Sequence, residues 1–376
     1  MKKFGIIVYR ETENIGDDIQ SYAASRLLPK IDYYIEREHL NEFVSDDGEI
    51  VNTILSGWYI HDILSFPPSI FINPIIISAH FTDHLLNKCP DYLNGYFVEY
   101  LKQHQPIGLR DSLIAKYLND LGVDNYFSGC LTLTLEKYKN IEKKNVIYAV
   151  DVDDEIIDYL KVITDKEIIE VSHRLDKKTN IKLSYEKRFN NVEKILKKYQ
   201  SASLVVTSRL HAALPTVALG TPVLFIKDDD LDSVNRVSEF YDLFDTTTAD
   251  EILNGVKDDI IINPINKEQH LIIRQKLMDN INDFITNKAI DYKKNSGLKD
   301  DYYNYFVKQK IYLKKNVESL IKWKQQVSDW QMEDLENQYK RKIEELNKEL
   351  ITAKKGVIYN FLCKSRNKVK SICKKN

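Results

Sequence analysis

An arginine and a histidine, Arg209 and His211, follow a short buried-strand pattern at 203–207 and open a helical pattern that runs to Leu219. This order places them at the carboxyl edge of a parallel sheet and at a helix N-terminus, whose unpaired N–H groups and positive dipole end attract anions. Arginine can bind a phosphate or carboxylate with two nitrogens, and histidine can carry a proton near neutral pH. With Ser208 beside the arginine, the segment predicts an anion site capable of acid–base chemistry. The alternative is that these side chains only cap and pack the helix.

A second arginine stands in a similar context in the first half of the chain. The segment Pro106–Asp111 has the pattern of a strand followed by Arg110 and by a helix that Asp111 opens. Arg110 could hold a second anionic group or could pair with Asp111 across the turn, and the sequence favours neither. Two such arginines, one in each half, would fit a cleft that binds one anion from both sides.

The loop after the first predicted strand, 3–9, contains Asn14, Gly16 and Asp17. Gly16 suits a tight turn, while Asp17 or Asp18 would cap the following helix or bind the hydroxyls of an acceptor. The chain contains neither G-x-G-x-x-G nor G-x-x-x-x-G-K-[ST], which argues against a dinucleotide fingerprint and a P-loop.

Three histidines, His61, His80 and His84, follow predicted strands. His80 and His84 are four residues apart, but HExxH is missing and no third ligand is evident, so no metal site is predicted. His61 and His80 are alternative candidates for a general acid or base.

The elements that must position these residues alternate between buried-strand and helical patterns, which predicts an α/β fold with parallel sheets covered on both faces. Strands are expected at 3–9, 53–55, 75–78, 106–109, 125–127, 145–150, 166–171, 203–207 and 222–225, and helices at 19–28, 111–121, 155–164, 190–199, 209–219 and 267–288. A charged segment at 136–144 interrupts the alternation. We therefore expect an N-terminal Rossmann-like domain over 1–140 and a C-terminal one over 141–295.

The remaining residues have a different composition. Residues 296–353 are expected to form a helical extension, either a short coiled coil that supports self-association through 325–355 or a single helix on the body. The formal net charge of −2 gives no case for nucleic-acid binding, yet residues 351–376 hold eight Lys/Arg and no acid, which leaves −10 for the rest (−2 minus +8). Apolar residues interleaved with this charge predict that 354–376 is a basic amphipathic tail for an anionic membrane surface. A solvated tail without a partner is the alternative.

The cysteine pattern and the N-terminus bear on location. The four cysteines show no paired spacing, and the apolar run after Lys3 ends at Arg10, too early for a secretory signal. No stretch is long enough to cross a bilayer. These features predict a cytoplasmic protein, with peripheral attachment at the inner face of the membrane through the tail.

Taken together and in this order, the segments resemble the polysaccharide pyruvyl transferase family over about residues 1–290. The matching pieces are N-x-G-D (Asn14, Gly16, Asp17), the strand and loop around Gly57 and His61, G-x-R-D (Gly108, Arg110, Asp111), SGCLTLTL (Ser128–Leu135), S-R-L-H-A (Ser208–Ala212) and L-G-x-P (Leu219–Pro222).

The resemblance implies a GT-B-like arrangement of the two domains. It also implies transfer of pyruvate from phosphoenolpyruvate to a free or lipid-linked sugar of a cell-surface glycan such as an exopolysaccharide, as a ketal, with release of phosphate and without a cofactor. The expected catalytic residues are His211, His61 and His80, and the expected substrate-binding residues are Arg110, Arg209, Ser208, Asn14, Gly16 and Asp17. Two other functions share these features: a GT-B glycosyltransferase that uses a nucleotide sugar, and a non-catalytic membrane-associated scaffold.

Overall fold

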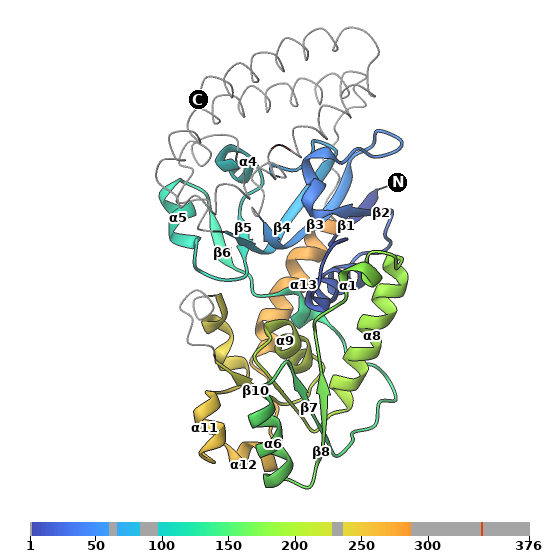
Figure 1. The fold of residues 1–376 in the computed structure, drawn as a ribbon. Helices are drawn as coiled ribbons and strands as arrows, with labels where there is room; N and C mark the ends of the chain where they lie inside the picture. The colour runs from blue at the N-terminus through green and yellow to red at the C-terminus, as the bar shows by residue number, and fades with distance from the viewer. Residues whose placement is uncertain (1, 60–65, 83–96, 228–235, 287–339, 341–376) are drawn as a thin grey trace, which may run out of the picture. The chain divides into compact units, whose positions relative to one another are not determined.

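The computed structural model describes residues 2–59, 66–82, 97–227, 236–286 and 340. Their strands form two separate sheets, and every strand pair in both sheets is parallel. Helices of the intervening segments cover the sheets (Figure 1). The predicted α/β class with two Rossmann-like units is therefore confirmed. The predicted extension 296–353 and tail 354–376 lie outside the described residues, except for Lys340.

The first sheet has the strand order β2-β1-β3-β4-β5-β6. Its strands are β1 (Lys3–Val8), β2 (Tyr33–Glu36), β3 (Val51–Tyr59), β4 (Ile72–Phe81), β5 (Ile107–Leu109) and β6 (Asn125–Phe127). Because β2 lies on one side of β1 and β3 on the other, the chain changes direction along the sheet between β1 and β3. Ligands of open parallel sheets bind outside the carboxyl ends of the strands at such a switch point.

The second sheet repeats this plan with the order β11-β10-β9-β7-β8. Its strands are β7 (Val146–Val150), β8 (Glu167–Val171), β9 (Leu204–Thr207), β10 (Val223–Ile226) and β11 (Asp245–Thr247). Here β8 and β9 flank β7, so the switch point lies between β7 and β9. The carboxyl end of β9 leads directly to Arg209.

The helices cover the sheets and join them into one core. They are α1 (Ile15–Leu27), α4 (Val98–Gln103), α5 (Ala115–Asp120), α6 (Asp154–Ile163), α7 (Lys177–Asn180), α8 (Tyr185–Ser201), α9 (Leu210–Ala218), α11 (Ala249–Leu253), α12 (Asp258–Ile262) and α13 (His270–Thr286), with 3₁₀ turns η1 (Arg37–Glu42), η3 (Leu131–Thr134) and η4 (Ser238–Leu243). The turn η3, part of the SGCLTLTL segment, packs against α1, α9 and α13. One buried apolar cluster consequently contains residues of both halves, such as Ile19 and Leu214. Where each domain begins and ends stays a prediction.

Several predicted elements differ from the observed ones. The helix expected at 111–121 is wrong at its start: α5 begins at Ala115, because Asp111 turns its carboxylate to His80 and the Ser112 amide donates to Glu239. The first helix begins at Ile15 rather than Ile19, since the Asn14 side chain caps it. The strand β11 was missed because its sequence, DTT, carries no apolar pattern.

Candidate active site

The switch point of the first sheet is built around Tyr9 and Gly57. Gly57 has φ +119°, and a Cβ at this position would overlap the Tyr9 hydroxyl, so glycine is required for the close approach. The Tyr9 hydroxyl donates to the Ser56 carbonyl at 3.3 Å. Arg37, which follows β2, lies over the Tyr9 ring at 4.6 Å and donates to the Trp58 carbonyl at 3.2 Å. This arrangement brings a cationic side chain to the carboxyl edge.

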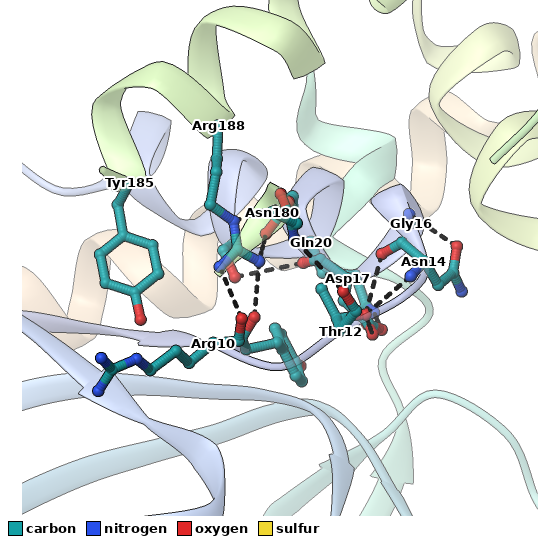
Figure 2. A network of polar contacts seen from close by, with 12 residues as sticks. Arg10, Thr12, Asn14, Gly16, Asp17, Gln20, Asn180, Tyr185 and Arg188 are labelled. Carbon is teal, nitrogen blue, oxygen red and sulfur yellow. Dashed lines mark hydrogen bonds and ion pairs between the residues drawn. The ribbon is translucent and has the colours of Figure 1, made fainter. Parts of the chain in front are cut away.

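The N-terminus of α1 carries the N-x-G-D residues (Figure 2). The Asn14 side chain accepts the Gly16 amide at 2.9 Å, and Asp17 accepts the Thr12 hydroxyl. Burial raises the pKa of Asp17, while the Thr12 hydrogen bond and the charges of Arg37 and Arg110 oppose the shift. Asn14, and not Asp17 or Asp18, is the helix cap, so the expectation that an aspartate caps this helix is wrong. Asp17 is therefore a buried carboxyl group that contacts Thr12 and Gln20 and feels the charges of Arg37 and Arg110.

Arg110 and His80 lie side by side at the ends of β5 and β4. Arg110 is 6% exposed and donates to the Gln20 side chain at 3.4 Å, whereas its buried Nε has no hydrogen-bond partner among the described residues. His80 Nδ1 lies 2.7 Å from a carboxylate oxygen of Asp111, and both side chains are almost fully buried. The G-x-R-D segment thus supplies an incompletely paired guanidinium and the carboxylate that orients His80.

A bulge in β4 sets the direction of these residues. The pairing of β3 with β4 shifts register between Leu55 and Gly57, where Ser78 has φ +56°, a left-handed conformation that costs a non-glycine residue energy. The Ser78 amide is held by the Ser128 hydroxyl at 2.9 Å, and that hydroxyl donates to the Leu109 carbonyl. After the bulge, Trp58 and His80 are register partners.

The switch point of the second sheet is built around Asp151. This residue follows β7 with φ +47°, and its carboxylate accepts the Ser172 hydroxyl at 2.8 Å and Arg209 Nε at 2.8 Å. The bond to Nε fixes the guanidinium of Arg209. The side chain of this arginine is 40% exposed. Arg209 lies at the N-terminus of α9, as predicted, and its side chain makes no capping hydrogen bond.

Two histidines stand next to this arginine. His173, after β8, is 1% exposed; its Nε2 lies 2.6 Å from the Tyr199 hydroxyl and its Nδ1 has no hydrogen-bond partner among the described residues. Burial lowers the pKa of His173 to about 4. Burial also lowers the pKa of His211 well below its usual value, and the charge of Arg110 adds to the effect. Both rings are therefore neutral at pH 7 in the unliganded protein.

The two carboxyl edges face one site, as the GT-B-like expectation requires. A Cβ on Gly16 would lie 3.0 Å from the His211 Cβ, so α1 of the first half meets α9 of the second. The loop before α1 also pairs with the loop after β8, through Ile15 N–H to the His173 carbonyl at 2.9 Å and Leu175 N–H to the Glu13 carbonyl at 2.7 Å. Because of these contacts, residues from both sheets can act on one small ligand.

A buried ion pair fastens the same junction. Arg188 of α8 binds the carboxylate of Asp18 and donates to the Tyr9 and Arg10 carbonyls, the latter at 3.3 Å. Figure 2 shows Arg188 between the start of α1 and the loop that follows β1. The loop that carries Tyr9 is thus held by a side chain from the second half.

The structure places most of the predicted site residues at this junction. Arg110, His80, Gly16, Asp17, Arg209 and His211 all lie at the facing carboxyl edges, whereas Asn14 and Ser208 are exposed at the rim. His61 and His84 lie outside the described residues. Within the described ranges no group of three or more His, Cys, Asp or Glu side chains could hold a metal ion.

Sequence reasoning missed Arg37, Asp151 and His173. Asp151 and His173 follow correctly predicted strands, so their position at the carboxyl edge was a usable signal, although neither belongs to a distinctive motif. Arg37 follows β2, which was not predicted. Its approach to Tyr9 depends on the pairing of β1 with β2, which the sequence does not reveal.

The family model for "Polysaccharide pyruvyl transferase" matches residues 14–230, which is more than half of the chain and contains Arg110, Arg209 and His211. The chain belongs to this family. The protein is therefore a transferase of polysaccharide biosynthesis. The resemblance inferred from the motifs is confirmed. A search among curated proteins found no match.

Solved structures resemble the chain only distantly. A UDP-N-acetylglucosamine 2-epimerase is 11% identical, with 74% of this chain and 91% of that chain covered and a TM-score of 0.41. The Methanocaldococcus jannaschii UDP-GlcNAc 2-epimerase with UDP-GlcNAc and UDP is 12% identical (77% and 94% covered, TM-score 0.35), and a functionally uncharacterized Klebsiella pneumoniae protein is 14% identical (65% and 93% covered, TM-score 0.36). At these TM-scores the likeness carries no argument about function. No helix in the described parts of this transferase is long and apolar enough to cross a membrane.

Proposed function

We propose that this transferase moves the pyruvyl group of phosphoenolpyruvate to two hydroxyls of a sugar in a glycan, as a ketal, and releases phosphate. The main support for the proposal is that Arg110, Arg209 and His211 lie at the facing edges of the two sheets in a member of the pyruvyl transferase family. Phosphoenolpyruvate has a phosphate and a carboxylate, and two arginines from opposite sides can bind both groups.

The buried polar atoms without partners favour an anionic ligand at this place. Arg110 Nε and His211 Nε2 are buried, and neither has a hydrogen-bond partner among the described residues. Leaving such atoms unpaired costs stability, which a bound anion would recover by accepting their N–H bonds. A neutral His211 gains a proton readily when a phosphate dianion arrives beside it, since opposite charge raises its pKa.

The proposed reaction joins two sugar hydroxyls to C2 of phosphoenolpyruvate. A proton adds to the methylene carbon of phosphoenolpyruvate, and a sugar hydroxyl forms a bond to C2 as it loses its own proton. The C2–O bond to phosphate then breaks, a second hydroxyl bonds to C2, and its proton leaves with the phosphate. His80, held by Asp111, and His211, beside the phosphate, are the proposed proton carriers, and such acid–base catalysis is worth about 10²–10⁴-fold in rate.

Phosphate release from phosphoenolpyruvate, measured with a panel of free and lipid-linked glycans, tests the proposal. The wild type should release phosphate only with an acceptor, and Arg209→Ala should abolish the release. Arg26→Ala is the matched control, because Arg26 is exposed in the last turn of α1 and its loss should leave the rate unchanged. Absence of release with every acceptor, together with thermal stabilisation by a nucleotide sugar, would favour a glycosyltransferase instead.

A further inference from the structure

The indole of Trp58 lies beside the His80–Asp111 pair at the carboxyl edge of the first sheet. Its ring meets the His80 ring edge to face, with centroids 5.5 Å apart. The indole N–H donates to the Thr82 hydroxyl at 2.6 Å, which fixes the orientation of the ring. Trp58 is partly exposed, whereas its neighbour Tyr59 is 2% exposed. The protein thus holds a large apolar face in a set position next to a candidate proton carrier.

Two cationic side chains, one from each half of the chain, contact Trp58. The guanidinium of Arg236, which precedes η4, lies 5.3 Å from the centroid of the Trp58 ring. Arg37 donates to the Trp58 carbonyl and covers Tyr9. A partly exposed aromatic face with a few hydrogen-bond donors around it is the usual make-up of a small-molecule site.

A pyranose sugar matches this combination. The C–H bonds on one face of a sugar ring are slightly positive and pack on the negative face of an aromatic ring, while its hydroxyls accept hydrogen bonds from arginine. The phosphate and carboxylate of the donor are better matched by Arg110, whose charge acts on His211, and by Arg209, which Asp151 holds in place. The region around the indole thus suits the uncharged substrate better than the charged one.

Resting on the proposed function, we propose that Trp58 and Arg236 form the acceptor subsite, in which a pyranose packs on the indole and presents its reacting hydroxyls to His80. Arg236 donates to hydroxyls of the same sugar. Trp58 and His80 are register partners on neighbouring strands, and their rings are in contact. A sugar that packs on the Trp58 ring therefore lies within reach of the His80 ring, so sugar binding and proton transfer occur at the same place.

A single-tryptophan protein tests binding without relying on turnover. The chain has three tryptophans, so Trp323→Phe with Trp330→Phe leaves Trp58 as the only indole fluorophore. Titration with methyl galactoside, methyl glucoside and methyl mannoside should change its emission in a saturable way for at least one sugar. Adding Arg236→Gln should weaken the binding of that sugar about tenfold, which is the loss expected from one polar contact to a charged group. A linear response to all three sugars, like that to glycerol, would overturn the proposal.

Steady-state kinetics separate the acceptor role from a purely structural one. With an acceptor that supports phosphate release, Trp58→Ala should raise the acceptor KM about tenfold or more, leave the phosphoenolpyruvate KM within about twofold, and be partly rescued by Trp58→Phe. Tyr117→Ala, which removes an exposed aromatic ring from α5, should change neither constant. Equal effects on both KM values would overturn the proposal. Sugar binding without any phosphate release would instead contradict the proposed function and leave the acceptor subsite standing.

Discussion

Near Arg209, the charge state of two histidines depends on what lies beside them. His173 and His211 are neutral without ligand because burial removes the solvation of the imidazolium form. Arg110 lowers the pKa of His211 further, so a second positive charge is unfavourable until an anion enters. Under the proposed function, donor binding and protonation of His211 are therefore coupled, and the acid appears only when its substrate is present.

The buried histidine His173 makes the stability of the fold depend on pH. Its pKa is about 4 in the folded chain and near 6.5 when unfolded, so the unfolded state binds more protons in between. The free energy of unfolding should fall by about 3 kcal/mol as the pH drops from 7 to 4 through this group. His173→Gln should remove most of this part of the dependence, as measured by urea unfolding across the range. An identical pH dependence in wild type and variant would contradict the assignment.

Asp151 is a positioning residue for Arg209. Its carboxylate holds Nε of the arginine, so Asp151→Asn should leave the guanidinium less ordered. Under the proposed function, this change should raise the KM for phosphoenolpyruvate about fivefold, with little change in kcat. The effect is modest because the Arg209 side chain is 40% exposed and water screens the pair. Asp153→Asn, two residues further in an exposed position, is the matched control. A fall in kcat at unchanged KM would assign Asp151 a different role.

At the scale of elements, local signals explain what the sequence predicts well. The buried strand before Ser208 and the helix after it follow from apolar periodicity, and they place Arg209 and His211 correctly. Local signals do not predict partners that come from distant elements. Which carboxylate would hold Arg209, and which side chain would stand over Tyr9, depends on the pairing of β7 with β9 and of β1 with β2, and a single sequence does not fix strand order.

The G-x-R-D segment shows where local reasoning fails. An acidic residue before a helical pattern normally stabilises the first turn of a helix, which is why 111–121 was expected to be helical. In the structure Asp111 is 1% exposed and bound to His80, so the helix starts four residues later at Ala115. A side chain needed at the site thus overrides the local propensity around it.

The junction of α1 and α8 depends on the buried pair of Asp18 and Arg188. Removing one partner of such a pair leaves an uncompensated buried charge and typically costs about 3–5 kcal/mol. Arg188→Gln should therefore destabilise the fold by that order, and Asp18→Asn in the same chain should restore part of the loss. A double-mutant cycle in urea should give a coupling of about 1–3 kcal/mol.

The exposed pair of Asp158 and Lys161 provides the reference for that cycle. Both of its side chains are more than half exposed, so its coupling should be below about 0.5 kcal/mol. If the coupling of Asp18 with Arg188 were equally small, the link between the two halves would rest on apolar packing of α1 against α8 and not on the ion pair.

At the scale of the whole molecule, the two sheets have the same arrangement of their first three strands. Each has a switch point next to its first strand, and the loop that follows β1 pairs with the loop that follows β8. Each half therefore supplies part of one site: Arg110 and His80 come from the first, and Arg209 and His211 from the second. This division explains why no single segment of the sequence contains the complete set of groups at the candidate site.

The distribution of charge over the whole chain leads to a last prediction, which concerns residues beyond those that the structure describes. Residues 351–376 carry eight basic side chains and no acid, against a net −10 elsewhere. Each basic residue contributes about 1 kcal/mol near an anionic bilayer, an attraction that salt weakens. The full chain should therefore co-sediment with phosphatidylserine-containing vesicles at low salt and not with neutral ones. Reversing Lys364, Arg366 and Lys368 to Glu should weaken binding at least about 100-fold.

A control variant with the same number of charge reversals outside the tail distinguishes an effect of the tail from an effect of the total charge of the chain. Changing Lys187, Lys194 and Lys198, three exposed lysines of α8, to Glu alters the net charge of the chain by the same amount. This change should leave vesicle binding within about twofold, because the tail, and not α8, is the predicted contact with the bilayer. Equal loss in both variants would mean that overall charge governs the attraction. A wild type that stays in the supernatant at low salt would remove the membrane role of the tail, and the acceptor glycan would then have to reach the transferase without a shared bilayer surface.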